Sequence, residues 1–164
     1  MKFGWLVWSA LSLVSLGMPA SAASDPRIAK LTMCRESWLD WKEIDPSALD
    51  AFGAFLGTAF SHAEDDGSLR PKTEMTLDGL KITRVFPGSV GTGLGFSVIL
   101  DATFDEARQA VERDLGKPLS DCQAGEGMRT CELSVAEKRT IMLVSADSPN
   151  DRTTLAGCYY FYEK

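Results

Sequence analysis

The side chains best suited to chemistry in this chain are a single histidine, four cysteines and a set of carboxylates. His62 is the only histidine, and Glu64, Asp65 and Asp66 follow it closely. An imidazole beside carboxylates can bind a metal ion, but these residues lack the spacing of a calcium loop. Asp65, Asp66 and Gly67 are more typical of an acidic turn after a helix, whose end would favour a protonated His62. We therefore predict no metal site and no cofactor.

Catalysis by other groups has little support in the sequence. A serine triad needs a histidine base, and no Gly-x-Ser-x-Gly elbow accompanies the single histidine. Paired carboxylates hydrolyse glycans, and the acidic cluster Asp101, Asp105 and Glu106 is the nearest candidate. Thr103 and Glu106, however, have the spacing of a helix capping box, which explains the last two acids structurally. The sequence therefore favours a protein that is not an enzyme, with a carboxylate-dependent glycan hydrolase as the alternative.

The four cysteines are Cys34, Cys122, Cys131 and Cys158. They lack the Cys-x-x-Cys spacing of zinc sites and redox-active pairs, so we expect two disulfides. Three pairings are open to four cysteines. We favour Cys122 with Cys131, stapling a local turn-forming stretch before a strand. Cys34 and Cys158 would then tie the N-terminal helical region to the last strand.

Residues 1–22 have the pattern of a secretory signal peptide. Lys2 precedes an apolar run from Phe3 to Met18, and residues 20–22 are the small residues Ala-Ser-Ala. The run is shorter than the roughly 20 residues of a spanning helix, and Met33 before Cys34 does not fit a lipidation site. We expect cleavage after Ala22, no stable membrane anchor, and a periplasmic or secreted protein. Residues 23–164 would form a single domain stapled by disulfides.

The charge balance restricts the partners of that domain. Removal of residues 1–22 removes one charge, Lys2, which leaves 16 Lys and Arg against 23 Asp and Glu, a net charge of −7. Such a surface repels nucleic acids and anionic membranes. We therefore expect another protein as the partner, with a basic one favoured by charge.

Two helices are predicted at the start of the domain. Asp25-Pro26 is a helix start signal, and an apolar stripe follows it at the positions Ile28, Leu31, Cys34, Trp38 and Trp41. Asp45-Pro46 repeats the signal, and apolar spacing predicts a second helix to about His62. Gly53 and Gly57 lie four residues apart on it, which would let a neighbouring element pack closely.

The rest of the chain is predicted to form mainly strands. The predicted strands are 74–77, 80–86, 94–101, 129–135, 140–145 and 153–162, with a helix over 104–115. Asp78-Gly79 would form a hairpin turn, and residues 87–93 a glycine-rich connection. The order α-α-β-β-β-α-β-β-β predicts an α+β fold with a mainly antiparallel sheet and helices on one face. It also contains a helix followed by three strands twice, a weak topological repeat.

A few residues are weak candidates for a binding surface: Gly91, Gly93, Arg84, Asp101, Tyr160 and Tyr162. Gly91 and Gly93 precede a strand rather than a helix, so they do not form a phosphate loop. The last strand carries aromatic residues on both faces, which favours a central, covered strand over an exposed edge.

These observations predict a small exported binding protein of a bacterial-type envelope, such as an inhibitor, an immunity-type protein or an accessory factor. A structural component of an envelope assembly, which adds a strand to a neighbour, is a further alternative beside the glycan hydrolase.

Overall fold

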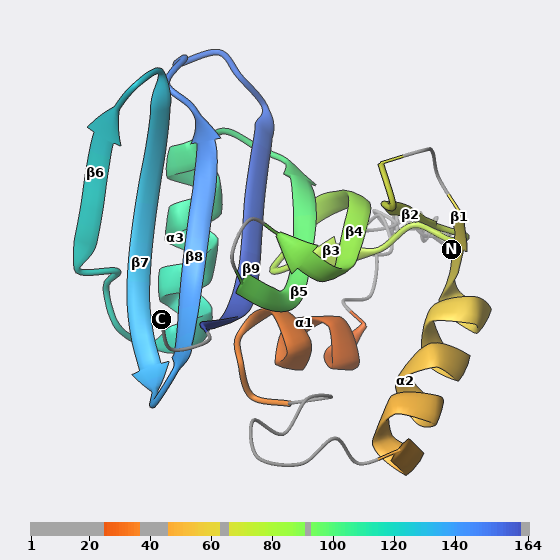
Figure 1. The fold of residues 1–164 in the computed structure, drawn as a ribbon. Coiled ribbons are helices and arrows are strands. Elements are labelled where there is room, and N and C mark those ends of the chain that lie inside the picture. The colour runs from red at the N-terminus through yellow and green to blue at the C-terminus, as the bar shows by residue number, and fades with distance from the viewer. Residues whose placement is uncertain (1–24, 37–45, 63–65, 91–92, 162–164) are drawn as a thin grey trace, which may run out of the picture.

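The computed structural model describes residues 25–36, 46–62, 66–90 and 93–161, which form an α+β fold (Figure 1). The helices are α1 (Pro26–Thr32), α2 (Pro46–Ala59) and α3 (Phe104–Leu115). The strands are β1 (Phe60–His62), β2 (Leu69–Pro71), β3 (Thr76–Leu77), β4 (Leu80–Val90), β5 (Gly93–Asp101), β6 (Asp121–Gly125), β7 (Met128–Ala136), β8 (Arg139–Ala146) and β9 (Thr153–Phe161).

The strands form one antiparallel sheet with the order β1-β2-β4-β5-β9-β8-β7-β6, and β3 pairs beside this path with β4. The last strand, β9, therefore lies in the middle of the sheet, between β5 and β8 (Figure 1). Tyr159 and Tyr160 point to opposite faces of β9, and they are only 2% and 4% exposed. This confirms the central, covered position predicted for the strand.

Helices pack against the central strands, as predicted. Strand β5 buries Phe96, Val98 and Leu100 at alternate positions, which gives the sheet an apolar face. Helix α1 contacts β5 and β9, and α3 contacts β8 and β9 (Figure 1). None of the helices within the described ranges is both long and apolar enough to cross a membrane.

Local capping signals set the bounds of α3 and of the β3–β4 hairpin. The Thr103 side chain accepts a hydrogen bond from the Glu106 backbone, and the Glu106 side chain accepts one from the Thr103 backbone. Gly116 ends the helix in the left-handed region at φ 67°. Asp78 and Gly79 have φ values of 47° and 82°, as a tight hairpin turn requires. Both predictions are confirmed.

The first two helices are shorter than predicted. Helix α1 ends at Thr32, and Cys34 has a φ of 56°, which turns the chain away from the predicted stripe. Its outer members, Trp38 and Trp41, lie outside the described residues. Helix α2 ends at Ala59, and residues 60–62 pair with β2 as strand β1 instead. Apolar spacing could not reveal this change, because Phe60 is buried as a strand residue as well.

The structure contains three strands that the sequence analysis did not predict, namely β1, β2 and β6. The glycine-rich connection 87–93 is also largely strand, since β4 runs to Val90 and β5 begins at Gly93. The turn-forming stretch between Cys122 and Cys131 is a hairpin: residues 123–125 belong to β6, Glu126-Gly127 is the turn, and residues 128–130 belong to β7. Five strands thus follow α2 and four follow α3, so the predicted repeat of one helix and three strands is not kept.

The two disulfides join the cysteines that the sequence favours. Cys122 and Cys131 lie directly opposite each other in the β6–β7 register, and their disulfide closes this hairpin. Cys34 and Cys158 join the segment after α1 to β9 across 124 residues. Two disulfides are typical of an oxidising compartment outside the cytoplasm.

Candidate functional site

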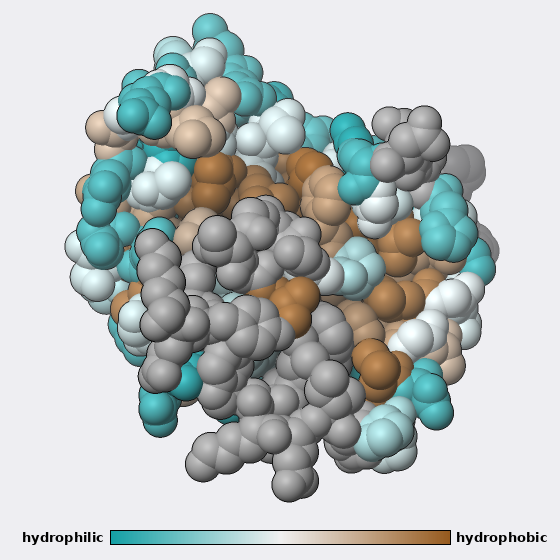
Figure 2. Space-filling view, viewed as in Figure 1, coloured by the Kyte–Doolittle hydropathy of each residue, from teal (hydrophilic) through white to brown (hydrophobic). Residues whose placement is uncertain are grey.

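A concave pocket lies between α2 and the β1–β2 pair. Its volume is about 800 Å³, within the usual range for ligand pockets. It is lined by Gly53, Leu56, Gly57, Phe60, Ser61, His62, Gly67, Leu69, Lys72 and Pro87. Figure 2 shows apolar surface in this part of the molecule, where α2 lies below β1 and β2 in the view of Figure 1. The site therefore combines apolar walls with a few polar groups.

Aromatic contacts hold α2 in place as one wall of this pocket. Phe52 packs edge-on against Phe96 of β5, with 6.1 Å between ring centroids. Phe55 packs in the same manner against Phe60 of β1, at 5.8 Å. The backbone N–H of Lys72 donates to the carbonyl of Ala59 at 3.0 Å, which fixes the chain just past β2 against the end of α2. These contacts fix α2 as one wall of the pocket and hold the chain after β2 against its end.

Gly53 and Gly57 leave a strip of α2 without side chains along the pocket. Among the described residues, a Cβ added at either glycine would meet nothing within 4 Å. Of the elements that the structure describes, none packs closely on these glycines as predicted. Both line the pocket instead.

The polar groups of the pocket come from its strand side. Lys72 Nζ donates to the carbonyl oxygen of Gly57 at 2.7 Å, close to the end of α2. The Ser61 hydroxyl donates to the carbonyl oxygen of Arg70 at 3.4 Å. His62 lies in β1 opposite Leu69 and is exposed, so it does not occupy the helix end at which the sequence placed it. Within the described residues, no three His, Cys, Asp or Glu side chains gather in a way that could hold a metal ion.

Arg84 lies close in the fold to the pocket but is not among its lining residues. Its guanidinium forms an ion pair with Asp66 at 3.0 Å, and Asp66 also accepts from the backbone N–H of Ser68 at 2.9 Å. These contacts fix the chain at Gly67, which does line the pocket. Arg84 is therefore a positioning residue for this rim rather than a group aimed into the site.

Asp101 lies far along the sheet from the pocket, in an exposed ion-pair network. Arg152 Nε donates to Asp101 at 2.9 Å, and Arg152 also pairs with Glu106 at 3.2 Å. The neighbouring Asp105 pairs with Arg129 at 2.9 Å. Hydrogen bonds from the backbone and then the side chain of Thr103 hold the pKa of Glu106 below its usual value, with a further contribution from Arg152. Each acid of the cluster thus has a structural partner.

The other candidates do not join the pocket. Tyr160 is buried in the core, and within the described structure its hydroxyl has no hydrogen-bond partner. The Arg139 guanidinium lies 5.8 Å from the centre of the Tyr160 ring. Gly93 is a sheet residue that pairs with Val90 and Phe161. Gly91 and Tyr162 lie outside the described residues.

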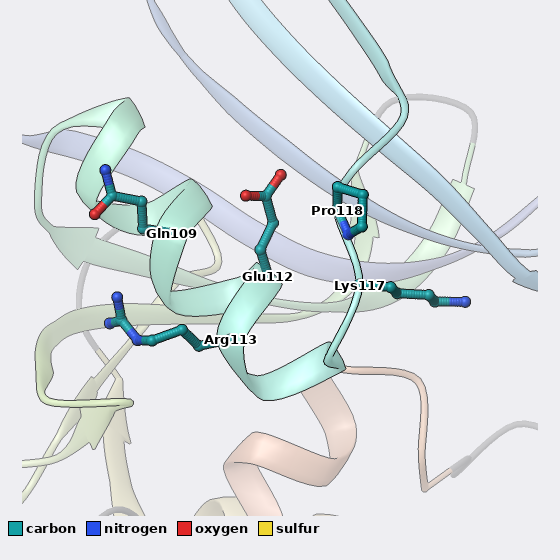
Figure 3. Close-up of a pocket in the computed structure, with 5 residues that line it drawn as sticks. All are labelled: Gln109, Glu112, Arg113, Lys117 and Pro118. Carbon is teal, nitrogen blue, oxygen red and sulfur yellow. The ribbon is translucent and has the colours of Figure 1, made fainter.

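A second, smaller hollow of about 400 Å³ lies beside the C-terminal half of α3 (Figure 3). Its side chains already serve the fold. Glu112 points toward Pro118 and accepts from the backbone N–H of Leu119 at 3.0 Å and from Arg108 at 2.9 Å (Figure 3). Arg113 pairs with Asp78 of the β3–β4 turn at 2.8 Å. These contacts dock α3 and leave the α2 pocket as the stronger site.

Sequence reasoning missed the pocket as a site, although it singled out three of its lining residues, Gly53, Gly57 and His62. The Gly53–Gly57 pair was the available signal, but the same spacing serves close packing equally well. The other walls could not be inferred, because β1 and β2 were not predicted. Comparisons of the chain with protein-family models, curated proteins and solved structures find no match.

Proposed function

We propose that this chain is an exported, non-enzymatic binding protein whose ligand occupies the pocket between α2 and the β1–β2 pair. The observation that carries the proposal is the pocket itself. It is an apolar hollow of about 800 Å³ with a small number of convergent polar groups, the usual form of a small-molecule site.

The N-terminal sequence and the disulfides support export. Residues 1–22 have the pattern of a signal peptide, and the disulfides Cys34–Cys158 and Cys122–Cys131 suit a periplasmic or secreted protein. Mass spectrometry of protein secreted from a bacterial host should find a mature chain that begins at Ala23. A chain that retains Met1 would contradict this part of the proposal.

The acidic cluster supports binding over glycan hydrolysis. A retaining or inverting glycosidase needs one carboxyl group whose pKa is raised, so that it can donate a proton near neutral pH. The pKa of Glu106 is lowered, and Asp101 and Asp105 are each paired with an arginine. A carboxyl group with a lowered pKa remains ionised at neutral pH, so Glu106 suits a helix N-terminus better than the role of a general acid.

A neutral fluorescent dye, phenylnaphthylamine, tests the proposed function. We expect its emission to rise with the mature, oxidised protein and to rise far less with the double variant Gly53→Leu/Gly57→Leu, which fills the pocket. The matched control is Ala54→Leu, because Ala54 is exposed on α2 and does not line the pocket. Absence of dye binding to the wild type, or equal binding by the filled variant, would refute the proposal.

A second candidate, assembly with another protein by strand addition, is favoured by β6. This strand ends the order of the described sheet, and all five of its residues are exposed. An exposed edge can pair with a strand from another chain. The variant Ala124→Lys should release a partner that the wild-type protein retains from envelope extract at low salt. Retention unchanged by this edge charge would exclude β6 as the contact.

A further inference from the structure

We infer that the pocket binds a single-chain amphipathic anion, with its apolar tail along the glycine strip of α2 and its carboxylate or phosphate at Lys72. The inference rests on the proposed function and adds the chemical class of the ligand. Three features carry it, namely the apolar walls, the bare helix strip and the charge of the lining.

The walls suit an unbranched apolar chain. Leu56, Phe60 and Leu69 give the pocket aliphatic and aromatic surface from α2, β1 and β2, and Pro87 adds a further apolar ring from β4. Gly53 and Gly57 lie one helical turn apart, so the helix backbone is bare along the pocket. A narrow alkyl chain can lie against this strip, whereas a bulky polar ligand would leave the backbone contacts unmade.

The charge of the lining differs in sign from that of the protein. The chain has a formal net charge of −6, yet Lys72 is the only formally charged side chain among the described lining residues. Two described acids lie near Lys72 along the chain: Glu74, which is exposed beside Arg70 and Lys81 outside this pocket, and Asp66, which is paired with Arg84 at 3.0 Å. A cation at an apolar pocket is complementary to an anionic head group, and the neighbouring Arg70 and Lys81 add positive charge on the same side of Lys72.

The position of Lys72 fits this role. Its ammonium donates to the carbonyl of Gly57 at 2.7 Å, which holds the charge beside the glycine strip. An ammonium group has three N–H donors, so this one bond leaves capacity for a carboxylate or a phosphate oxygen. Lys72 also satisfies a carbonyl near the end of α2, as a purely structural helix cap would. The experiment must therefore separate head-group recognition from capping.

Competition between matched ligands makes that separation. Dodecanoate and dodecanol share one alkyl chain and differ in charge. Each is titrated against the protein loaded with phenylnaphthylamine, dodecanoate below its micelle concentration and dodecanol below its solubility limit. We expect dodecanoate to displace the dye more effectively. The variant Lys72→Met should weaken dodecanoate binding about threefold to fivefold and leave dodecanol binding unchanged, since an exposed ion pair has an effect of that order. Lys72→Arg should restore the preference for the anion.

Lys117→Met is the control for a general loss of positive charge, because Lys117 is exposed after α3 and lines neither this pocket nor the neighbouring hollow that Lys72 shares with Arg70 and Lys81. The melting temperature of each variant measures separately how much Lys72 stabilises the end of α2. A structural cap alone predicts that Lys72→Met lowers the melting temperature and weakens both ligands equally, and that result would overturn the inference. Equal affinity of the wild type for the acid and the alcohol would overturn it too, while leaving the proposed function intact.

Further titrations distinguish a free amphipathic anion from an anionic phospholipid in a membrane. Dodecyl phosphate tests a phosphate head group against the carboxylate of a free fatty acid. The tighter binder of the two identifies the head group, and both support the inference. Binding only to vesicles of anionic phospholipid, unaffected by Gly53→Leu/Gly57→Leu, would mean that a membrane surface rather than the pocket is recognised. Failure of dodecanoate, dodecyl phosphate and the neutral dye alike would refute both the inference and the proposed function.

Discussion

At the scale of single residues, ion pairs and caps account for most charged groups that the sequence singled out. Arg152 joins Asp101 at the end of β5 to Glu106 in the first turn of α3. Arg84 fixes Asp66 at the rim of the pocket. These pairs are exposed, so each contributes little to stability by itself, and their main effect is to fix the geometry of neighbouring turns.

The capping carboxylate makes a pH-dependent prediction. Because the pKa of Glu106 is lowered in the folded protein, its contribution is complete above the ordinary value of 4.5 and is lost as the pH falls through the lowered value. Urea unfolding should therefore show that Glu106→Gln is less stable than wild type at neutral pH, and that the difference shrinks below pH 4.5. Glu137→Gln, in the exposed β7–β8 turn, is the control. A difference that persists or grows in acid would contradict this role.

At the scale of elements, glycines serve opposite purposes in α2 and in the sheet. Gly53 and Gly57 face the pocket, and the absence of their side chains keeps it open. Gly95 and Gly157 lie on the paired central strands β5 and β9, where the backbones approach closely. A Cβ at Gly95 would overlap the carbonyl of Cys158, and one at Gly157 would lie 2.7 Å from the carbonyl oxygen of Phe96. Only the second pair of glycines is required by packing.

The same substitution should therefore have opposite effects in the two elements. We expect Gly53→Ala and Gly57→Ala each to raise the free energy of unfolding by about 0.5–1 kcal/mol, because alanine favours the helix and meets no described neighbour. Gly95→Ala and Gly157→Ala should lower it by about 1–3 kcal/mol, because neither backbone contact can move aside. Denaturant unfolding of the four single variants measures this. Destabilisation by the helix variants would show that another part of the chain packs on the glycine strip.

At the scale of the whole molecule, β9 holds the fold together. It pairs with β5 on one side and β8 on the other, so it joins the N-terminal strands to the C-terminal meander. The Cys34–Cys158 disulfide adds α1 to the same strand. The other disulfide, Cys122–Cys131, lies within one hairpin at the far end of the sheet. Loss of the two bonds should therefore have unequal effects.

Loop-closure entropy gives the size of the difference. The bridges span 124 and 9 residues, for which the chain-entropy model gives about 5 and about 2.6 kcal/mol respectively. Urea unfolding should find Cys34→Ala/Cys158→Ala considerably less stable than Cys122→Ala/Cys131→Ala. Reduced wild-type protein provides the reference for loss of both bonds. Equal losses, or a greater loss for the hairpin pair, would show that the long-range bridge does not restrict the unfolded chain as we expect.

The sequence by itself determined the elements whose signals are local. The Thr103–Glu106 box and Gly116 bound α3 correctly, and Asp78-Gly79 forms the predicted turn, because these signals act between residues a few positions apart. The alternation of β5 and the covered position of β9 also followed from pattern and composition. The fold class could be predicted for the same reason. For the cysteines, the sequence only favoured one of three pairings, and the structure contains that one.

Only the tertiary structure decided where α2 ends, that β1, β2 and β6 exist, and that a pocket lies between the first two of these strands and α2. Short strands are stabilised by partners distant in the sequence, so a local pattern does not specify them. The glycines of α2 show the same limit. Their spacing alone suits close packing, and only the position of β1 and β2 turns the bare strip into the wall of a cavity.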